Sequence, residues 1–312
     1  PTIASQYSMR KDHITDTLSR HGYSADMLSA VVGRGGLLPP VKSGAYEVNE
    51  EMADVLMNRP VLEHASNLGG LIAKDIADEA GIPAYIYDSV SVDELSDVAR
   101  ITGLSEIVRT SQSHCLNMRA AAIKTAQEMG SAYTDMNLVV AHLGGGISLS
   151  AHRHGQMLDI VSDDEGPFSP ERSGRLPIKN FIKLCAQHDI NDIKKMVRGN
   201  GGLVSLLGTN SALEVQKRID SGDERARLVY EAMAYQIAKS IGELAVVLDG
   251  EVDAIVITGG IAYSEFITEY IKKKVSFIAP VKILPGENEL ESLAFGAYRV
   301  LTGEEKAHIF AE

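Results

Sequence analysis

The sequence predicts an α/β protein built as two related domains that face a cleft. Two observations carry this prediction. The C-terminal half contains three short strands followed by alternating helices and strands, in the order βββαβαβα, and the N-terminal half contains αβαβ, the last part of the same order. Strands and helices that alternate in this way form sheets covered by helices. We therefore expect an internal duplication whose first copy lacks its three opening strands.

The N-terminal half supplies four of the expected elements. A helix is predicted over 6–21, because Gly22 ends its pattern, and a strand over 28–32 leads into Gly33-Arg34-Gly35-Gly36. A helical region over 50–79 is interrupted at Pro60, since proline lacks the amide hydrogen that a helix interior needs. A strand over 84–87 ends on Asp88.

The C-terminal half opens with three strands, predicted over 138–143, 147–151 and 157–161, with tight turns at 144–146 and 154–155. A long helix opened by Asp223 and closed by Gly250 follows. The strand over 254–258 ends in Gly259-Gly260, and a helix, a strand over 281–284 and a final helix from about 289 complete the series.

Composition excludes several classes of protein. The 312 residues suffice for two domains, and 45% hydrophobic with 23% charged residues is typical of a soluble globular chain. A net charge of −12 argues against general affinity for nucleic acid or anionic membranes. No apolar run reaches the length of a spanning helix and no signal peptide is recognisable, so we expect a cytoplasmic protein. Cys115 and Cys185 have no metal-site spacing and are predicted to be buried thiols.

Two glycine-rich turns are candidates for binding phosphate and nucleoside. Gly144-Gly145-Gly146 lets backbone amides approach an anion, with His142 and Ser148 as possible donors beside it. Gly259-Gly260-Ile261 follows a buried strand, where open α/β sheets bind ligands. Each turn also has a purely structural explanation, a hairpin for the first and close helix packing for the second.

Charged residues form a second set of candidates. Arg34 and Arg172 suit a carboxylate or phosphoryl group, His114 suits phosphoryl oxygens, and Asp88 with Glu289 suits Mg²⁺. Taken singly, each residue is better explained by a structural role: the arginines as surface residues or ion-pair partners, His114 as a structural histidine, Asp88 by a turn and Glu289 by a helix cap. His152 and His154 flank a turn and are predicted to be solvated.

Taken together and in order, the motifs closely resemble those of the butyrate kinases in the acetokinase family. The matching blocks lie at 31–38, 63–69, 141–148, 166–174, 207–210, 231–236 and 258–264. The resemblance implies two duplicated actin-like (ribonuclease H-like) domains of the actin, sugar-kinase and Hsp70 superfamily. It places an incomplete acetokinase-type domain over 1–95 plus 292–312 and a nucleotide-binding domain over 96–291.

The resemblance also implies a role for each candidate. Arg34 matches the arginine that receives the acyl carboxylate, Arg172 the one that bridges it to the γ-phosphoryl group, and His114 the histidine that steadies that group. Asp88 and Glu289 match the acidic residues around Mg²⁺. The residues that match those binding the ATP phosphates are His142, Gly144, Gly145 and Gly146. The residues that match those near the nucleoside are Thr209, Asn210, Gly259, Gly260 and Ile261.

The activity implied is reversible, direct in-line transfer from ATP to a short-chain fatty acid such as butyrate or isobutyrate, giving acyl phosphate and ADP. ATP and Mg²⁺ are the implied cofactors, and a homo-oligomer is the implied assembly. The sequence lacks the Asn-x-Gly-Ser-x-Ser loop with which family members open, and its first residue is Pro1, so we expect a missing N-terminal segment. Ser211 replaces an expected Asp, and Arg175 an expected Gly.

Three alternatives stay open. An acetate or propionate kinase fits the same chemistry, although the Gly33–Pro40 stretch and the triple glycine follow the butyrate pattern. A sugar kinase needs a carboxylate base for a hydroxyl group, for which Asp88 is the best candidate. A non-catalytic nucleotide-binding module, or an inactive fragment of such a kinase, is favoured by the missing phosphate loop and opposed by the retained arginines and carboxylates.

Overall fold

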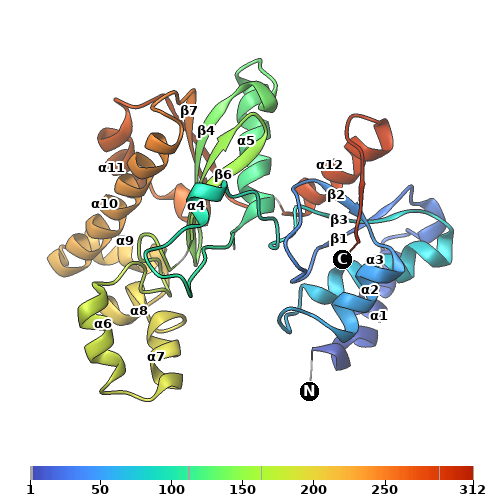
Figure 1. The fold of residues 1–312 in the computed structure, drawn as a ribbon, viewed down its shortest axis with the longest axis horizontal. Helices are drawn as coiled ribbons and strands as arrows, with labels where there is room; N and C mark the ends of the chain where they lie inside the picture. The colour runs from blue at the N-terminus through green and yellow to red at the C-terminus, as the bar shows by residue number, and fades with distance from the viewer. Residues whose placement is uncertain (1–2, 112, 163, 288, 312) are drawn as a thin grey trace. The chain divides into compact units, whose positions relative to one another are not determined.

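The computed structural model describes residues 3–111, 113–162, 164–287 and 289–311. The chain divides into two compact units, Pro1–Glu94 with Asn288–Glu312 (unit 1) and Leu95–Glu287 (unit 2). Each unit contains a sheet with helices packed on it, so the predicted α/β class is confirmed (Figure 1).

Unit 1 has a four-stranded sheet in the order β1-β3-β2-β9. Its strands are β1 (Val31–Arg34), β2 (Ala45–Glu47), β3 (Ala84–Tyr87) and β9 (His308–Ile309). Its helices are α1 (Tyr7–Arg20), α2 (Glu50–Asn58), α3 (Asn67–Ala80) and α12 (Glu289–Thr302), with 3-10 turns η1 (Ala4–Gln6) and η2 (Ala25–Met27). β1 is parallel to β3, β2 antiparallel to β3, and β9 parallel to β2.

The helices of unit 1 cover both faces of its sheet. Ile86 packs beside Gly70 of α3, whereas the ring of the next residue, Tyr87, lies on Gly296 of α12. Successive strand residues point to opposite faces, so α3 and α12 lie on opposite sides of the sheet (Figure 1). The strand predicted over 28–32 begins and ends later in the structure. Residues 25–27 form a 3-10 turn, and the sheet hydrogen bonds begin where Val31 N donates to Pro83 O. Arg34 is the last residue of this strand.

Unit 2 has a five-stranded sheet in the order β6-β5-β4-β7-β8. Its strands are β4 (Asn137–Leu143), β5 (Ile147–Arg153), β6 (Gln156–Val161), β7 (Ala254–Gly259) and β8 (Val281–Pro285). Its helices are α4 (Asp97–Arg100), α5 (Cys115–Glu128), α6 (Ile178–Cys185), α7 (Ile190–Val197), α8 (Gly202–Leu207), α9 (Ala212–Asp220), α10 (Glu224–Val247) and α11 (Glu265–Val275), with 3-10 turns η3 (Tyr133–Asp135) and η4 (Gly260–Tyr263). The meander β4-β5-β6 is antiparallel, and β4, β7 and β8 are parallel.

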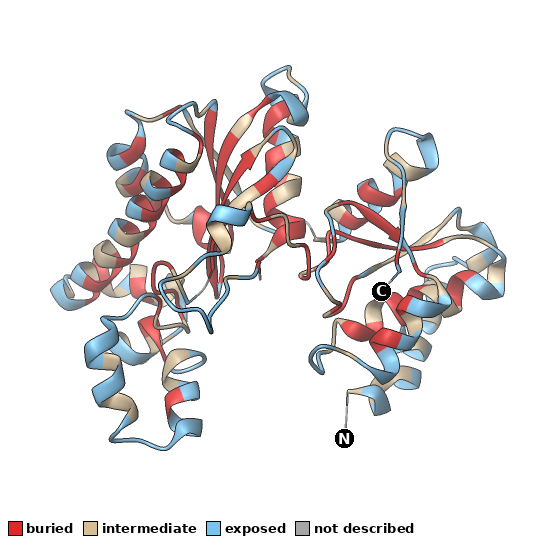
Figure 2. Ribbon diagram, viewed as in Figure 1, coloured by how far each residue is buried: buried red, intermediate tan, exposed pale blue. Residues whose placement is uncertain are grey.

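The two faces of this sheet differ in chemistry. The face toward α10 and α11 carries an apolar core that includes Val139, Leu149 and Ile255 (Figure 2). The opposite face packs against α5 and is partly polar although buried, because alternation along β4 and β5 points every second residue there. Beside the apolar Leu138 and Val140, this face carries buried polar residues that include His142, Ser148, Ser150, His152 and Thr258.

His152 therefore corrects the sequence prediction. It was expected to be solvated, but it is fully buried, with Nδ1 2.7 Å from Tyr133 Oη and Nε2 2.6 Å from Ser150 Oγ. The face of β5 that carries His152 is covered by α5 and η3, through Met118 and Tyr133. His154, on the turn, is exposed as predicted. Of the two cysteines, Cys115 is buried as predicted, but Cys185 is only partly buried.

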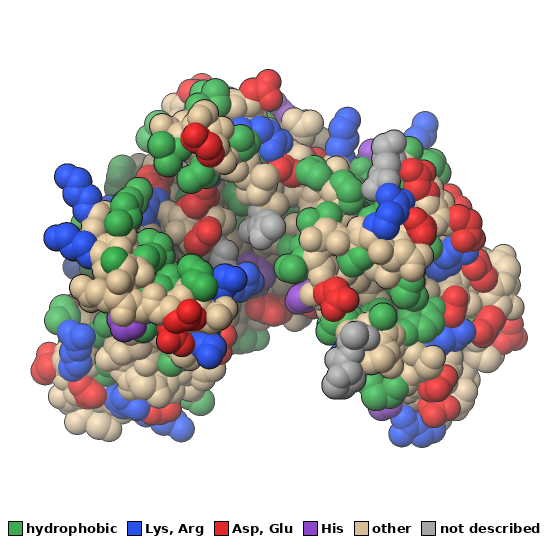
Figure 3. Space-filling model, turned by 60° about the horizontal axis from the view of Figure 1, so that its bottom comes forward, with side chains coloured by type: hydrophobic (Ala, Val, Ile, Leu, Met, Phe, Trp, Pro, Cys, Tyr) green, Lys and Arg blue, Asp and Glu red, His purple; other side chains and the backbone are tan. Residues whose placement is uncertain are grey.

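The excess of acidic residues is spread over the surface. Figure 3 shows acidic and basic side chains interspersed on the face that it presents. Among the described residues, no helix combines the length and the apolar character that crossing a lipid bilayer requires.

Candidate functional site

The carboxyl edge of the unit 2 sheet collects the candidate residues of that unit. β4 and β7 run parallel, and their register puts His142 beside Thr258 just before both strands end. The glycine turn Gly144–Gly146 follows one strand, and Gly259 ends the other. Open α/β sheets bind ligands outside the carboxyl ends of their strands, so the topology alone places a binding site at this edge.

The glycine turn is held by its own backbone and by the 166–174 loop. Gly144 N donates to Gly146 O at 3.0 Å, and Ser169 Oγ donates to Gly145 O at 2.8 Å. The guanidinium of Arg172 lies directly on Gly146, where a Cβ atom would overlap Nη1. An arginine held against backbone that carries no side chain is suited to an anion bound by both.

Two histidines stack beside this turn. The rings of His114 and His142 are 4.4 Å apart with an interplanar angle of 27°, and His114 Nδ1 lies 2.8 Å from Ser148 Oγ. His142 is 1% exposed, and its Nε2 lies 3.1 Å from Glu287 Oε1. That approach is not aligned for hydrogen bonding, and neither ring nitrogen has a hydrogen-bond partner among the described residues. A buried polar group without a partner is costly, so a ligand is its natural complement.

A cavity of about 550 Å³ opens beside the second glycine motif. Gly259 has φ 93°, and a Cβ there would lie 2.5 Å from Leu143 O, so only glycine fits at this strand end. Gly260 and Ile261 line the cavity; Gly259 is not part of the lining. The other lining residues are Ala212, Leu213, Gln216, Tyr230, Tyr263, Ser264, Glu265 and Phe266. Apolar walls with a few polar groups are typical of a small-molecule site.

Thr209 and Asn210 are not among the residues that line the cavity, although they lead directly into α9, which helps to form it. Thr209 Oγ1 donates to Glu214 Oε2 at 2.7 Å and so lowers the pKa of that carboxyl. Asn210 Nδ2 donates to Glu171 Oε1 at 2.6 Å, which ties this segment to the residue before Arg172. In this structure the two residues contact Glu214 and Glu171 and do not form part of the cavity wall.

The candidates of unit 1 meet at the carboxyl edge of its own sheet. Parallel pairing puts Arg34 beside Tyr87, the residue before Asp88. Arg34 Nη1 lies 3.0 Å from both Glu289 oxygens, with the arginine side chain 47% exposed. Asp88 is buried with φ 42°, and its Oδ1 accepts a 2.7 Å hydrogen bond from Gly44 N. A left-handed backbone is uncommon for Asp, which marks this strand end as constrained.

The carboxylates of Asp88 and Glu289 have the chemistry that Mg²⁺ prefers. Within the ranges that the structure describes, no three His, Cys, Asp or Glu side chains converge on one point. Mg²⁺ does not need such a cage, because it is usually held by one or two carboxylates together with substrate phosphates and water. The two carboxylates therefore fit the ion, although the Glu289 oxygens are engaged with Arg34.

The structure groups the predicted residues within each unit. Arg34 and Glu289 lie together near Asp88, and His114, His142, the glycine turn and Arg172 lie together at the other sheet edge. Sequence reasoning missed Glu287 beside His142, Glu171 beside Asn210, and most of the cavity lining. Glu287 follows β8, which is parallel to β7, so its position after a strand end was the one available signal.

Comparison with known proteins fits this arrangement. The chain is 48% identical to butyrate kinase 2 from Clostridium acetobutylicum over 309 residues, covering 98% of this chain and 87% of the relative. An acetate kinase from Porphyromonas gingivalis superposes with a TM-score of 0.81 at 19% identity, covering 94% of this chain and 84% of that one. An acetate kinase from Entamoeba histolytica superposes with a TM-score of 0.74 at 16% identity, covering 92% and 85%.

These structural similarities establish the fold. The model of the acetokinase family matches residues 105–304, which span most of unit 2 and all of α12. With that match and the sequence identity to butyrate kinase 2, the chain belongs to the acetokinase family.

Proposed function

We propose that this protein is an ATP-dependent carboxylate kinase that converts butyrate, isobutyrate or a similar short-chain acid into its acyl phosphate. The observation that carries the proposal is the placement of Arg172 against the bare backbone of Gly146, together with the buried His142, whose ring nitrogens have no hydrogen bond among the described residues. Sequence identity to butyrate kinase 2 supports the choice of acid. A cytoplasmic location, a homo-oligomeric assembly and the two domain assignments made from the sequence belong to the same proposal.

The chemistry of a carboxylate acceptor explains the residue types. A carboxylate is already a nucleophile and needs no general base, so the enzyme has to overcome the repulsion between two anions and align them. Arg34 holds the acceptor carboxylate through its planar fork, in place of the Glu289 carboxylate. Arg172 and His114 donate to the transferring phosphoryl oxygens, and transfer is direct, without a phosphoenzyme.

The nucleotide binds to unit 2. His142 and the turn Gly144–Gly146 contact the ATP phosphates, and the cavity at Gly260 and Ile261 receives the adenosine. Burial raises the pKa of Tyr230, so its hydroxyl in the cavity wall stays protonated. Asp88 and Glu289 would hold Mg²⁺, which, when bound, neutralises phosphate charge during transfer.

The test is hydroxamate trapping of the acyl phosphate together with ADP release. Acetate, propionate, butyrate, isobutyrate and isovalerate would be compared by kcat/KM. We expect the highest values for the four- and five-carbon acids, with neighbours in the series separated by about 10–200-fold, since one methylene in an apolar pocket contributes about 1–3 kcal/mol.

Two results would contradict this assignment. A preference for acetate or propionate would reassign the substrate within the family. ATP binding without acyl phosphate from any acid would indicate a non-catalytic nucleotide-binding module, which the location of the whole cavity within unit 2 would then explain.

A further inference from the structure

The loop that carries Arg172 is closed at its base. Arg175 N donates to Gly166 O at 2.8 Å, which joins the two ends of the 166–174 segment. Inside the loop, Ser169 N donates to Arg172 O at 3.1 Å, and Phe168 N donates to Gln236 Oε1 of α10 at 3.2 Å. The loop also bonds to the 197–204 segment, where Ser173 N donates to Val197 O and Leu203 N donates to Ser169 O. The base is therefore one of two anchors that decide where the Arg172 guanidinium lies.

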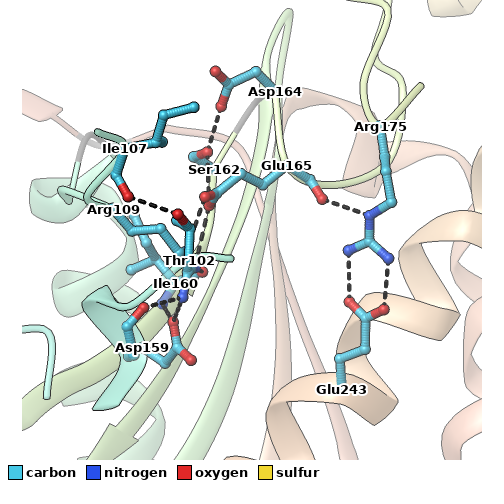
Figure 4. Close-up of polar contacts among 11 residues, drawn as sticks. Thr102, Ile107, Arg109, Asp159, Ile160, Ser162, Asp164, Glu165, Arg175 and Glu243 are labelled. Carbon is cyan, nitrogen blue, oxygen red and sulfur yellow. Dashed lines mark hydrogen bonds and ion pairs between the residues drawn. The ribbon is translucent and has the colours of Figure 1, made fainter. Parts of the chain in front are cut away.

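The side chain of Arg175 anchors that base to helix α10. Its Nη1 and Nη2 donate to Glu243 Oε1 and Oε2 of α10 at 2.7 and 2.9 Å (Figure 4). Its Nε donates to Glu165 O at 2.8 Å, so one guanidinium is hydrogen-bonded both to α10 and to the residue before the loop. The pairing lowers the pKa of Glu243 and so favours the ionised pair.

A second arginine holds the same flank from the side of the sheet. Arg109 Nε and Nη2 donate to the Glu165 carboxylate at 2.8 and 3.1 Å, and Nη1 donates to Asp159 Oδ1 of β6 at 3.0 Å (Figure 4). Glu165 is thus fixed twice, by its carbonyl to Arg175 and by its side chain to Arg109. The loop base is thereby attached to both α10 and β6.

We propose that Arg175 is a positioning residue of the reaction: through Glu243 and the Glu165 carbonyl it fixes the 166–174 loop and thereby holds Arg172 on the glycine turn. The inference rests on the proposed kinase function. Arg175 stands where the resemblance implies a Gly, which has no side chain to form such an anchor.

The size and place of the expected effect follow from the geometry. Arg175 and Glu243 are 52% and 42% exposed, and exposed ion pairs contribute little to global stability. Alignment at a transferring group is far more sensitive, since a displacement of about 1 Å costs up to about 10²-fold in rate. The pair therefore affects turnover more than folding or ATP binding.

Kinetics of Arg175→Met, Glu243→Met and the double variant test the proposal. Each single variant is expected to lower kcat about 3- to 30-fold with the KM for ATP changed less than about 2-fold, by the same sensitivity to alignment. The double variant should lose no more than the worse single one, because both changes break one contact. Arg175→Lys, which keeps the charge without the fork, should recover part of kcat.

Hydrogen exchange tests the same proposal without relying on activity. The amides of Phe168, Ser169, Ser173 and Arg175 are all hydrogen-bonded, and they should exchange faster in Arg175→Met while β4 is unchanged. Arg153→Met is the control, since it removes another ion pair of unit 2, with Asp249, at the end of β5 away from the glycine turn. It should alter neither kcat nor loop exchange.

The two readouts separate the possible failures. Unchanged loop exchange in Arg175→Met overturns the positioning role whether or not the protein is active. Unchanged kcat in an active Arg175→Met variant does the same. If the wild-type protein forms no acyl phosphate, the kinase proposal fails, and the exchange data still decide whether Arg175 fixes the loop.

Discussion

The carboxyl edges of the two sheets carry charges in different states. In unit 1 the Arg34 guanidinium is paired with both oxygens of Glu289, and the Asp88 carboxylate accepts the Gly44 amide. In unit 2 the buried His142 has two ring nitrogens without hydrogen bonds among the described residues, and Arg172 lies on bare glycine backbone. One edge pairs its arginine with a carboxylate, whereas the other sets its arginine and a buried histidine beside glycine backbone.

This difference indicates how each edge meets its substrate. An arginine already paired with a carboxylate has to exchange that partner for the carboxylate of the substrate, so Glu289 competes with the acid for Arg34. A buried histidine whose ring nitrogens have no hydrogen bond among the described residues gains one when a phosphate binds, so the second edge is preorganised for the anion. The following variants test whether that contrast is functional.

Removing the arginine on the glycine turn should have the largest effect. Arg172→Ala is expected to lower kcat by about 10²–10³-fold, the range seen when one donor to developing charge is removed. The KM for ATP should change little, because the nucleoside cavity is formed by other residues. Steady-state kinetics with butyrate would measure both values. An unchanged kcat would remove Arg172 from the mechanism.

A methyl group on the turn should reproduce part of that loss. Gly146→Ala places a Cβ where Arg172 Nη1 now lies, so the guanidinium has to move, and we expect kcat to fall about 10–100-fold. Gly145→Ala is the comparison, because a Cβ there meets no atom within 4 Å. Equal kcat values for the two alanine variants would show that the position of Arg172 is not what the turn controls.

Glu289 tests the sheet edge of unit 1. If its carboxylate serves Mg²⁺ as proposed, Glu289→Gln should lower kcat about tenfold and raise the Mg²⁺ concentration for half-maximal rate, in line with losses at residues that support metal sites. If Glu289 only competes for Arg34, the variant should instead lower the KM for butyrate and leave kcat and the Mg²⁺ dependence alone. Titrating both ligands distinguishes these outcomes.

Local patterns predicted the elements with strong signals. The strand at 84–87 and the N-cap of α10 at Asp223, whose side chain accepts from Ala226 N, were correct because apolar runs and caps are properties of a few adjacent residues. The strands at 45–47 and 308–309 were missed because two or three residues show no period. Helix α5 gives a weaker signal in the sequence, because its buried face includes polar residues such as Asn117 and Thr125.

The site was predictable as a set of residues but not as a set of contacts. Arg34 and Glu289 are 255 positions apart, and no local pattern indicates that they pair. The ring stacking of His114 and His142 likewise depends on how α5 meets β4. His152 was misassigned for the same reason, since only tertiary structure shows that a helix covers its strand face.

That buried histidine gives the last prediction, which concerns stability rather than turnover. Burial, with the nearby Arg119 charge, lowers the pKa of His152 to about 3 from an ordinary 6.5. Between these values the unfolded chain binds a proton that the native state does not. The free energy of unfolding should therefore fall as pH drops from about 6.5 toward 3, by up to about 1.4 kcal/mol per pH unit from this one group.

Urea unfolding between pH 7 and 4 would measure the slope. His152→Gln should be less stable at pH 7, because a buried hydrogen-bonded ring is lost, but its stability should decline less steeply with falling pH. His154→Gln is the matched control, two residues along and exposed, and should keep the wild-type slope. If the free energy of unfolding falls with pH equally in wild type and His152→Gln, burial does not hold His152 neutral in the native state.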